Sequence, residues 1–237
     1  FDGHATHVTG TIAGAGLVQE SYTGYAPKAT IVSQSFSNII TYAPTYVQDY
    51  GMVIANNSYG SVVNDCSYNG LYDLTSRILD QQAFDLPELQ HVFAAGNDGV
   101  LTCGPYPFGF RTVLGGYQSA KNVITVGSTF FRGDITVNSS KGPVRDGRIK
   151  PEITAQGQSV RSLWLNNGFS SFSGTSMSSP GVSGGLVLLE QRYRQLHSGS
   201  NAQNGLLKAL ICNGGTDAGN EGPDFRHGFG NMNLLRS

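Results

Sequence analysis

Charged residues, cysteines and long apolar runs are all scarce in this sequence. Only 13% of its 237 residues are charged and the formal net charge is -1, so it has neither a basic field that would attract nucleic acid nor an acidic tail. No run of eighteen apolar residues occurs, so no membrane-spanning helix is predicted. The three cysteines are too few for a metal framework or a disulfide-rich scaffold, and we expect one disulfide and one buried thiol.

Glycine, in contrast, is abundant, and the 32 glycines fall between apolar runs, where tight loops at strand ends require them. The length fits one α/β domain with a full core. The pattern predicts strands at 26–33, 52–60, 91–95, 123–128 and 153–155, and helices near 4–13, 45–50, 71–78, 180–196 and 206–212. Their alternation predicts a parallel sheet with helices on both faces, and ligands bind such sheets beyond the carboxyl ends of the strands.

The segment GTSMSSP at 174–180 places a serine where a loop gives way to a long helix. Beyond it, apolar residues recur at steps of three and four and predict one buried helix face: Val182, Leu186, Leu189, Tyr193 and Leu196. The N–H groups of a first helical turn lack intrahelical partners, so they would stabilise an oxyanion beside Ser176. Alternatively, Ser176 and Thr175 merely cap the helix, as serine and threonine commonly do.

Two histidines lie near the start of the chain, in the segment GHATHVTG at 3–10. His4 is placed where a helix is predicted to begin, and it is either a general base or a structural histidine. His7 belongs to the apolar stripe of that helix and is expected in the core. A zinc site is disfavoured, because no glutamate lies between the two histidines and no third ligand is evident.

Polar residues follow two of the predicted strands, one ending in Tyr59-Gly60 and another followed by Asn97. Taken alone, the Asn-Asp-Gly at 97–99 is most often a turn. A serine nucleophile needs a base, a group that orients the base, and donors for the charge that forms on the attacked carbonyl. His4 fits the base, Ser176 the nucleophile, and the Asn97 amide with the Ser176 N–H the donors. The orienting carboxylate is not evident.

Three separated segments resemble those of the subtilisin-like serine proteases (subtilases, peptidase family S8), secreted bacterial members in particular. They are the histidine segment at 4–10, AGNDG at 95–99 and the serine segment at 174–180, with further matches at 24–27, 57–60, 142–151 and 222–230. Ala5 stands where the family usually has glycine. The α/β-hydrolase elbow is excluded because it needs a glycine where Ser178 stands, and no phosphate-binding loop with Gly-Lys-Ser/Thr occurs.

The resemblance implies a three-layer α/β fold and a serine endopeptidase in which His4, Ser176 and Asn97 are catalytic. In the family, the triad aspartate ends a strand upstream of the histidine, whereas Phe1 lies only three residues before His4. We therefore expect residues 1–237 to be a single catalytic domain that is incomplete at its N-terminus. An upstream segment or a second chain would carry the aspartate, while Asp2 is expected to serve as a turn or cap.

The resemblance also assigns substrate binding to the residues along one strand edge and beside the oxyanion asparagine: Ser58, Tyr59, Gly60, Ala95 and Gly96. The implied partners are an extended protein or peptide substrate and, optionally, a propeptide. No cofactor is required. Structural calcium is compatible with the family, but the segment at 16–21 lacks the usual asparagine-rich pattern and no calcium ligand is identified. The alternative is an inactive fragment or pseudo-protease that binds extended peptides without cleaving them.

The family resemblance also implies a secreted or extracellular protein, which bears on the cysteines. Cys66 and Cys103 lie just beyond two strand ends that would form the cleft, so we expect a disulfide between them at the pocket rim. Cys212, in the predicted helix at 206–212, is expected to be a buried thiol. Asp98 flanks the first specificity pocket of relatives, where it would weakly favour a basic substrate side chain.

Overall fold

The central sheet is parallel and four-stranded. The structure, a computed structural model, describes residues 2–36, 38–61 and 65–237. In these residues β1 (Ile54–Asn57), β2 (Gln90–Ala94), β3 (Ile124–Thr129) and β4 (Ile153–Gln156) lie in the order β1-β2-β3-β4, and every neighbouring pair is parallel. β2 and β3 are buried along their whole length, which explains their apolar runs. These four strands were predicted from the sequence.

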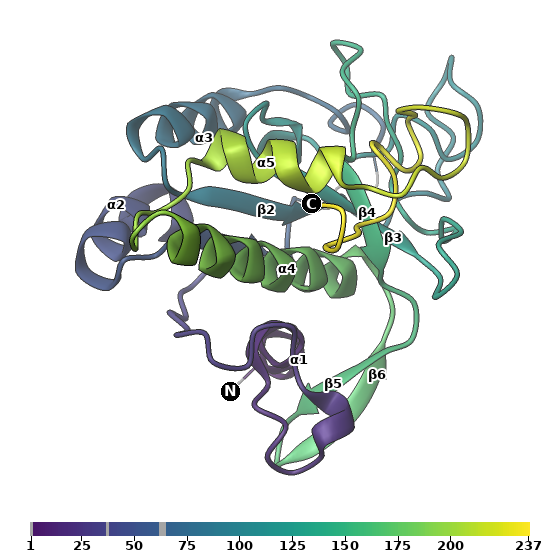
Figure 1. The fold of residues 1–237 in the computed structure, drawn as a ribbon. Coiled ribbons are helices and arrows are strands. Elements are labelled where there is room, and N and C mark those ends of the chain that lie inside the picture. The colour runs from purple at the N-terminus through teal and green to yellow at the C-terminus, as the bar shows by residue number, and fades with distance from the viewer. Residues whose placement is uncertain (1, 37, 62–64) are drawn as a thin grey trace.

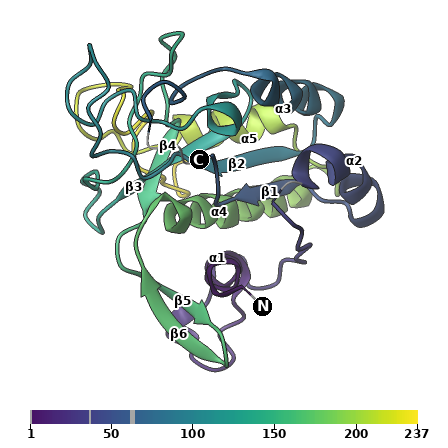
Figure 2. The same ribbon diagram turned by 180° about the vertical axis from the view of Figure 1, so that it is seen from behind.

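Helices cover both faces of this sheet, as Figures 1 and 2 show from opposite sides. On one face, α4 (Thr175–Leu196) and α5 (Asn204–Asn213) pack against the sheet, and the largest core cluster joins them: Val92, Ile124, Val126, Ile153, Val182, Leu186, Leu207 and Ile211. On the other face, α2 (Asn38–Tyr50) packs against β1, and α3 (Leu74–Asp85) packs against β2. The predicted three-layer α/β fold is therefore confirmed.

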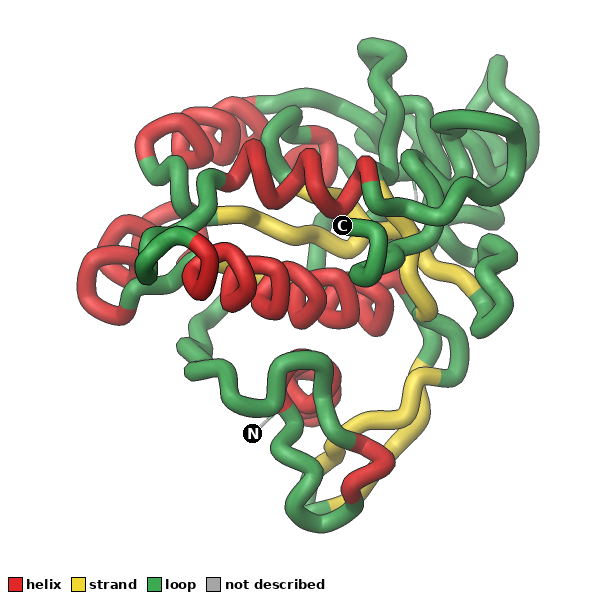
Figure 3. The backbone as a smooth tube through the Cα atoms, viewed as in Figure 1, coloured by secondary structure: helices red, strands yellow, loops and turns green. Residues whose placement is uncertain are grey.

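The strand expected at 26–33 does not form. The segment from Ala26 to Ser35 follows an irregular path and pairs with no strand (Figure 3). A strand needs a neighbouring backbone with which to exchange N–H and C=O bonds. This segment has none, because a pocket separates it from β1. The apolar pattern correctly indicated residues that favour a strand. It could not show that no neighbouring strand is available to pair with them.

A β-hairpin in the last third of the chain was missed. β5 (Val160–Trp164) and β6 (Gly168–Phe172) pair antiparallel through a turn in which Asn166 and Asn167 both have a φ of 57°. Asn-Gly at 167–168 between two short strands is a hairpin signal, so the sequence did contain the evidence. The hairpin projects away from the central sheet and supports α1 (Gly3–Ala13), as Figure 1 shows.

The first helix, α1, confirms two expectations about single residues. Asp2 caps it, because its Oδ1 accepts a hydrogen bond of 2.7 Å from the Ala5 N–H. His7 is fully buried, with its Nε2 3.0 Å from the Val160 carbonyl oxygen and 3.2 Å from that of Ser170. His7 thus fastens α1 to both strands of the hairpin and is a structural residue.

The cysteines behave largely as expected. Cys66 and Cys103 form a disulfide. Cys212 is a free, partly buried thiol in α5, and burial raises its pKa to about 11, so it is a poor nucleophile at neutral pH. Two short 3₁₀ helices, Glu20–Tyr22 and Gly116–Ser119, complete the structure. Within the described ranges, no helix is long and apolar enough to span a bilayer.

Candidate active site

Ser176 stands in the first turn of α4 and is held by the end of β1. The helix begins after Gly174, whose φ of 145° lies in the region that favours glycine. The Ser176 hydroxyl donates to the Ser58 carbonyl oxygen at 3.2 Å, and the Ser58 hydroxyl donates to the Ser176 carbonyl oxygen at 3.0 Å. This reciprocal pair joins residues that are 118 positions apart and fixes the serine relative to the sheet.

Asn97, directly beyond the end of β2, is oriented by Thr175. The Asn97 Oδ1 accepts two hydrogen bonds from Thr175, at 3.0 Å from its backbone N–H and at 3.1 Å from its hydroxyl. The Thr175 Oγ1 in turn accepts a bond of 3.2 Å from the Gly96 N–H. Because the oxygen of the amide is engaged, the Nδ2 is turned away from Thr175 and bonds to no described residue. An exposed amide donor therefore stands beside the positive N-terminus of α4.

A second connection between β1 and α4 involves Asn56. Its Oδ1 accepts bonds of 2.9 Å from the hydroxyls of both Ser179 and Ser183, and its Nδ2 donates to the Ser58 Oγ at 3.1 Å. Ser179 and Ser183 of α4 therefore anchor this helix to the end of β1. Sequence reasoning missed the anchoring roles of Asn56, Ser58 and Thr175, because these contacts appear only once the fold brings the two segments together.

His4 lies in the first turn of α1, half-buried, and lines a pocket of about 800 Å³. Its ring makes no hydrogen bond to Ser176, whose hydroxyl is bonded to Ser58 instead. Within residues 2–36, 38–61 and 65–237, no carboxylate lies within 4.0 Å of the ring. The structure thus places the predicted base beside a pocket, with no carboxylate among the described residues to orient it.

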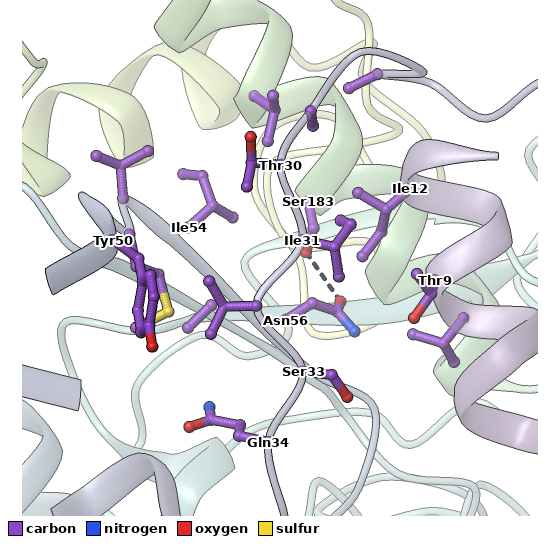
Figure 4. Close-up of a pocket in the computed structure, with 18 of the residues that line it drawn as sticks. Thr9, Ile12, Thr30, Ile31, Ser33, Gln34, Tyr50, Ile54, Asn56 and Ser183 are labelled. Atoms are coloured by element: carbon purple, nitrogen blue, oxygen red, sulfur yellow. Dashed lines mark hydrogen bonds between the residues drawn. The ribbon is translucent and has the colours of Figure 1, made fainter. Parts of the chain in front are cut away.

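The pocket runs between β1 and the irregular segment at 26–36, with α1 and α4 as its other walls. Figure 4 shows Thr30, Ile31 and Ser33 on one side and Ile54 and Asn56 of β1 behind them. Neither Ser176 nor Asn97 lines it.

The pocket also leaves one edge of β1 open. β1 pairs with β2 through Val53, Ala55 and Asn57, so the backbone groups of Ile54 and Asn56 point to the opposite edge. In the described part of the chain, no strand pairs with that edge.

Of the residues predicted to bind substrate, Ser58, Ala95 and Gly96 are buried, and Tyr59 and Gly60 are half-buried. Tyr59 packs its ring against Phe93 and Tyr117, and its carbonyl oxygen accepts a bond of 2.8 Å from Gln118 Nε2. Gly60 and Ser58 lie next to it along the chain, and Gly60 remains half-exposed.

Ala95 and Gly96 are buried, with their N–H and C=O groups bonded to Leu114, Val126, Thr175 and Ser140. These bonds fix the backbone that leads to Asn97. A role for Ala95 and Gly96 in substrate binding stays a prediction.

Asp98 follows Asn97 and is buried. Its backbone N–H donates to the Ser140 Oγ at 3.0 Å, and its Oδ2 accepts a bond of 3.3 Å from the Asn69 Nδ2. Burial raises the pKa of the Asp98 carboxyl, and the bond from Asn69 partly opposes this shift. The Asp98 side chain is therefore packed in the interior next to Asn97 and is not a solvated surface charge.

A model described as the subtilase family matches residues 1–230. The chain belongs to the subtilase family. Among relatives, it is 27% identical over 253 residues to the membrane-bound transcription factor site-1 protease of Mus musculus, covering 99% of this chain and 21% of that protein. This subtilase chain thus spans about a fifth of the length of that relative.

Two solved structures share the subtilase fold. The CspB protease of Clostridium perfringens superposes with a TM-score of 0.83 at 17% identity, covering 100% of this chain and 79% of that one. The prenylagaramide maturation protease PagA has a TM-score of 0.75 at 23% identity, covering 100% and 82%. At these identities the likeness shows the fold of this subtilase and no finer property.

Proposed function

We propose that this subtilase is a serine endopeptidase in which Ser176 is the nucleophile, His4 the general base and Asn97 the oxyanion donor. The observation that carries the proposal is the Asn97 amide. Its oxygen is fixed by two bonds from Thr175, which leaves its Nδ2 as a donor beside the first turn of the helix that bears Ser176. A turn or a helix cap would have no need for this arrangement.

In the proposed reaction, the His4 ring takes the Ser176 hydroxyl proton as Oγ attacks the substrate carbonyl carbon. The oxygen of that carbonyl becomes negative and accepts hydrogen bonds from the Asn97 Nδ2 and the Ser176 N–H. The protonated His4 then gives its proton to the leaving amine, and water releases the acyl group in a second cycle. For the first step, the Ser176 hydroxyl must leave the Ser58 carbonyl that it contacts here.

The carboxylate that orients His4 is proposed to come from a further segment, upstream in the chain or on a second chain. Two observations support it. His4 lines a pocket of about 800 Å³, and the backbone groups of Ile54 and Asn56 face that pocket from an unpaired edge of β1. An extended segment that paired with this edge would satisfy those groups. Running parallel to β1, it would also end on the side of the sheet where Asn97 and Ser176 lie.

The same scheme bears on the domain, its cofactors and its location. We propose that residues 1–237 form one catalytic domain completed by that segment, and that a propeptide can occupy the same cleft. Base, nucleophile and oxyanion donors are all protein groups, so the reaction as proposed needs no cofactor; structural calcium remains open, with no ligand assigned. The Cys66–Cys103 disulfide supports a secreted or extracellular location, because disulfides persist in oxidising compartments.

The test is covalent labelling of the full-length protein with a small fluorophosphonate, followed by peptide mapping. Ser176 should be the one labelled serine, and Ser176→Ala should abolish both labelling and casein hydrolysis. Ser173→Ala, an exposed serine three positions away, is the matched control and should behave as wild type. Labelling at another serine, or hydrolysis by Ser176→Ala, would refute the assignment.

The alternative is a peptide-binding protein without catalysis, and one observation favours it: the Ser176 hydroxyl contacts Ser58 and not His4. The same experiment separates the two functions. A catalytic chain is labelled at a rate that falls in His4→Ala, because the base is lost. A binding protein would retain peptides without being labelled at all.

A further inference from the structure

The disulfide joins the two loops that leave the strand ends next to the proposed catalytic groups. Cys66 lies in the loop after β1, six residues beyond Gly60, and Cys103 lies in the loop after β2, six residues beyond Asn97. Their Cα atoms are 5.3 Å apart across 37 residues of sequence. The bond therefore links the loop that follows the predicted substrate edge to the loop that follows the oxyanion donor.

Hydrogen bonds extend this link toward Asn97. The Arg111 Nη2 donates to the Cys66 carbonyl oxygen at 3.1 Å. Three residues beyond Cys66, the Asn69 Nδ2 donates to the Asp98 carboxylate at 3.3 Å. Asp98 directly follows Asn97, so the cross-linked loop contacts the residue next to the proposed oxyanion donor.

The two catalytic groups have separate anchors. Thr175 holds the amide oxygen of Asn97, and Ser58 holds Ser176. None of these bonds involves the loops around Cys66 and Cys103. Breaking the disulfide should therefore alter the rim of the cleft and leave nucleophile and oxyanion donor in place.

We propose that the Cys66–Cys103 disulfide is a positioning cross-link that holds the cleft rim in the form that binds extended peptides. The proposal rests on the proposed function, because it takes Asn97 and the Ser58–Gly60 edge as parts of the cleft. Cys66 is partly exposed, so a small dithiol can reach the bond. The dithiol supplies two electrons and two protons, the S–S bond breaks to give two thiols, and the reductant becomes a disulfide.

The experiment compares the full-length protein before and after mild reduction with a dithiol, using an extended peptide substrate and a small fluorophosphonate. Reduction should raise KM for the peptide by about tenfold, which corresponds to a loss of about 1.4 kcal/mol of peptide binding. The labelling rate of Ser176 should change by less than about twofold, because the small reagent does not use the rim. Reoxidation should restore KM. Cys66→Ala/Cys103→Ala should reproduce the reduced state, and Cys212→Ala, which removes the free thiol, should remain like wild type and respond to reduction.

Each outcome bears on one claim. If oxidised wild type is not labelled at Ser176, the proposed function fails. If it is labelled but KM is unchanged on complete reduction, confirmed by thiol alkylation, the positioning role fails while the proposed function stands. A parallel loss of labelling and peptide turnover, with loss of circular dichroism, would show that the bond only maintains the fold, and it too would overturn the proposal. Should the double variant fail to fold, the reduction and reoxidation series on wild type decides the question.

Discussion

Ser176 and His4 are held in the structure in very different ways. Ser176 and its neighbour Thr175 are tied to the ends of β1 and β2 by five hydrogen bonds within the chain, involving Ser58, Asn97 and Gly96. The His4 ring has no such bond among the described residues, and it faces a pocket beside an unpaired strand edge. The proposed nucleophile and oxyanion donor are thus oriented by hydrogen bonds within this chain, whereas the proposed base is positioned only by the helix that carries it.

The difference follows from where the two groups are attached. Ser176 and Thr175 begin a helix whose face is buried in the largest core cluster, and they bond to residues just beyond the ends of β1 and β2. The histidine helix packs on a hairpin outside the central sheet and on α4. Ser176 is therefore oriented by contacts with the central sheet, whereas His4 is oriented only by the position of α1.

The largest effect is expected from the ion cluster formed by Lys150 and Glu152, just before β4, and Lys208 of α5. Lys150 is fully buried, with its Nζ 2.6 Å from the Glu152 Oε1, and the Lys208 Nζ is 2.8 Å from the same oxygen. Glu152→Gln leaves a buried ammonium unpaired and should lower the free energy of unfolding by about 3–5 kcal/mol. Asp146→Asn, which breaks an exposed pair with Arg148, should cost less than about 1 kcal/mol. Urea denaturation of both variants measures the contrast.

This cluster also gives a pH dependence with a definite sign. Burial alone would raise the pKa of Glu152, but the Lys150 and Lys208 ammonium groups outweigh it and hold the pKa below its ordinary value. A carboxyl with a lowered pKa contributes stability above its unfolded pKa and loses it as the pH falls through the folded pKa. The wild type should therefore lose stability on acidification below the ordinary glutamate range. Glu152→Gln should lack this part of the acid transition.

Asn97→Ala should lower kcat by about 10²–10³ with little change in KM, because the amide acts on charge that exists only after attack. This magnitude is carried over from subtilisin, a member of the same family. Steady-state kinetics of the full-length protein on a peptide substrate measure the split. An effect confined to KM would instead make Asn97 a substrate-binding residue.

Thr175→Val should lower kcat by about threefold to tenfold, because one of the two hydrogen bonds that orient the Asn97 amide is lost. Thr175→Ser keeps the hydroxyl and should retain most of the activity. In the Asn97→Ala background, Thr175→Val should have no further effect on kcat, since the amide that it orients is gone. Additive losses would show that Thr175 acts by some route other than Asn97.

The last expected change concerns the open edge of β1 beside His4; it is a difference between amides of one chain and leaves kcat and the free energy of unfolding unchanged. In residues 1–237 alone, the amide protons of Ile54 and Asn56 should exchange at least about tenfold faster than those of Ala55 and Asn57, which face β2. In a protein that contains the proposed segment, all four should be slow if that segment pairs with the open edge. Equal exchange in the two proteins would mean that no strand occupies the pocket.

The sequence predicted features that depend on local patterns and missed those that depend on contacts between distant residues. The parallel core was predictable, because runs such as 91–95 and 123–128 are apolar wherever they pack, and the three family segments located Ser176, Asn97 and His4. The strand expected at 26–33 was wrong, because pairing depends on a neighbour that local pattern does not reveal. The contacts of Ser58 with Ser176 were missed because they join residues 118 positions apart. The β5–β6 hairpin, in contrast, had a local signal at Asn167-Gly168.

The bonds of His7 determine when α1 can take its place during synthesis. Its ring contacts the carbonyl oxygens of Val160 and Ser170, which follow it by 153 and 163 residues. At a synthesis rate of about 5–20 residues per second, these acceptors emerge roughly 8 to 33 s after His7 itself. Until then α1 has no hairpin to pack on. Among the elements described in residues 1–237, the helix that carries the proposed base is therefore synthesised first and is among the last that can reach its native contacts.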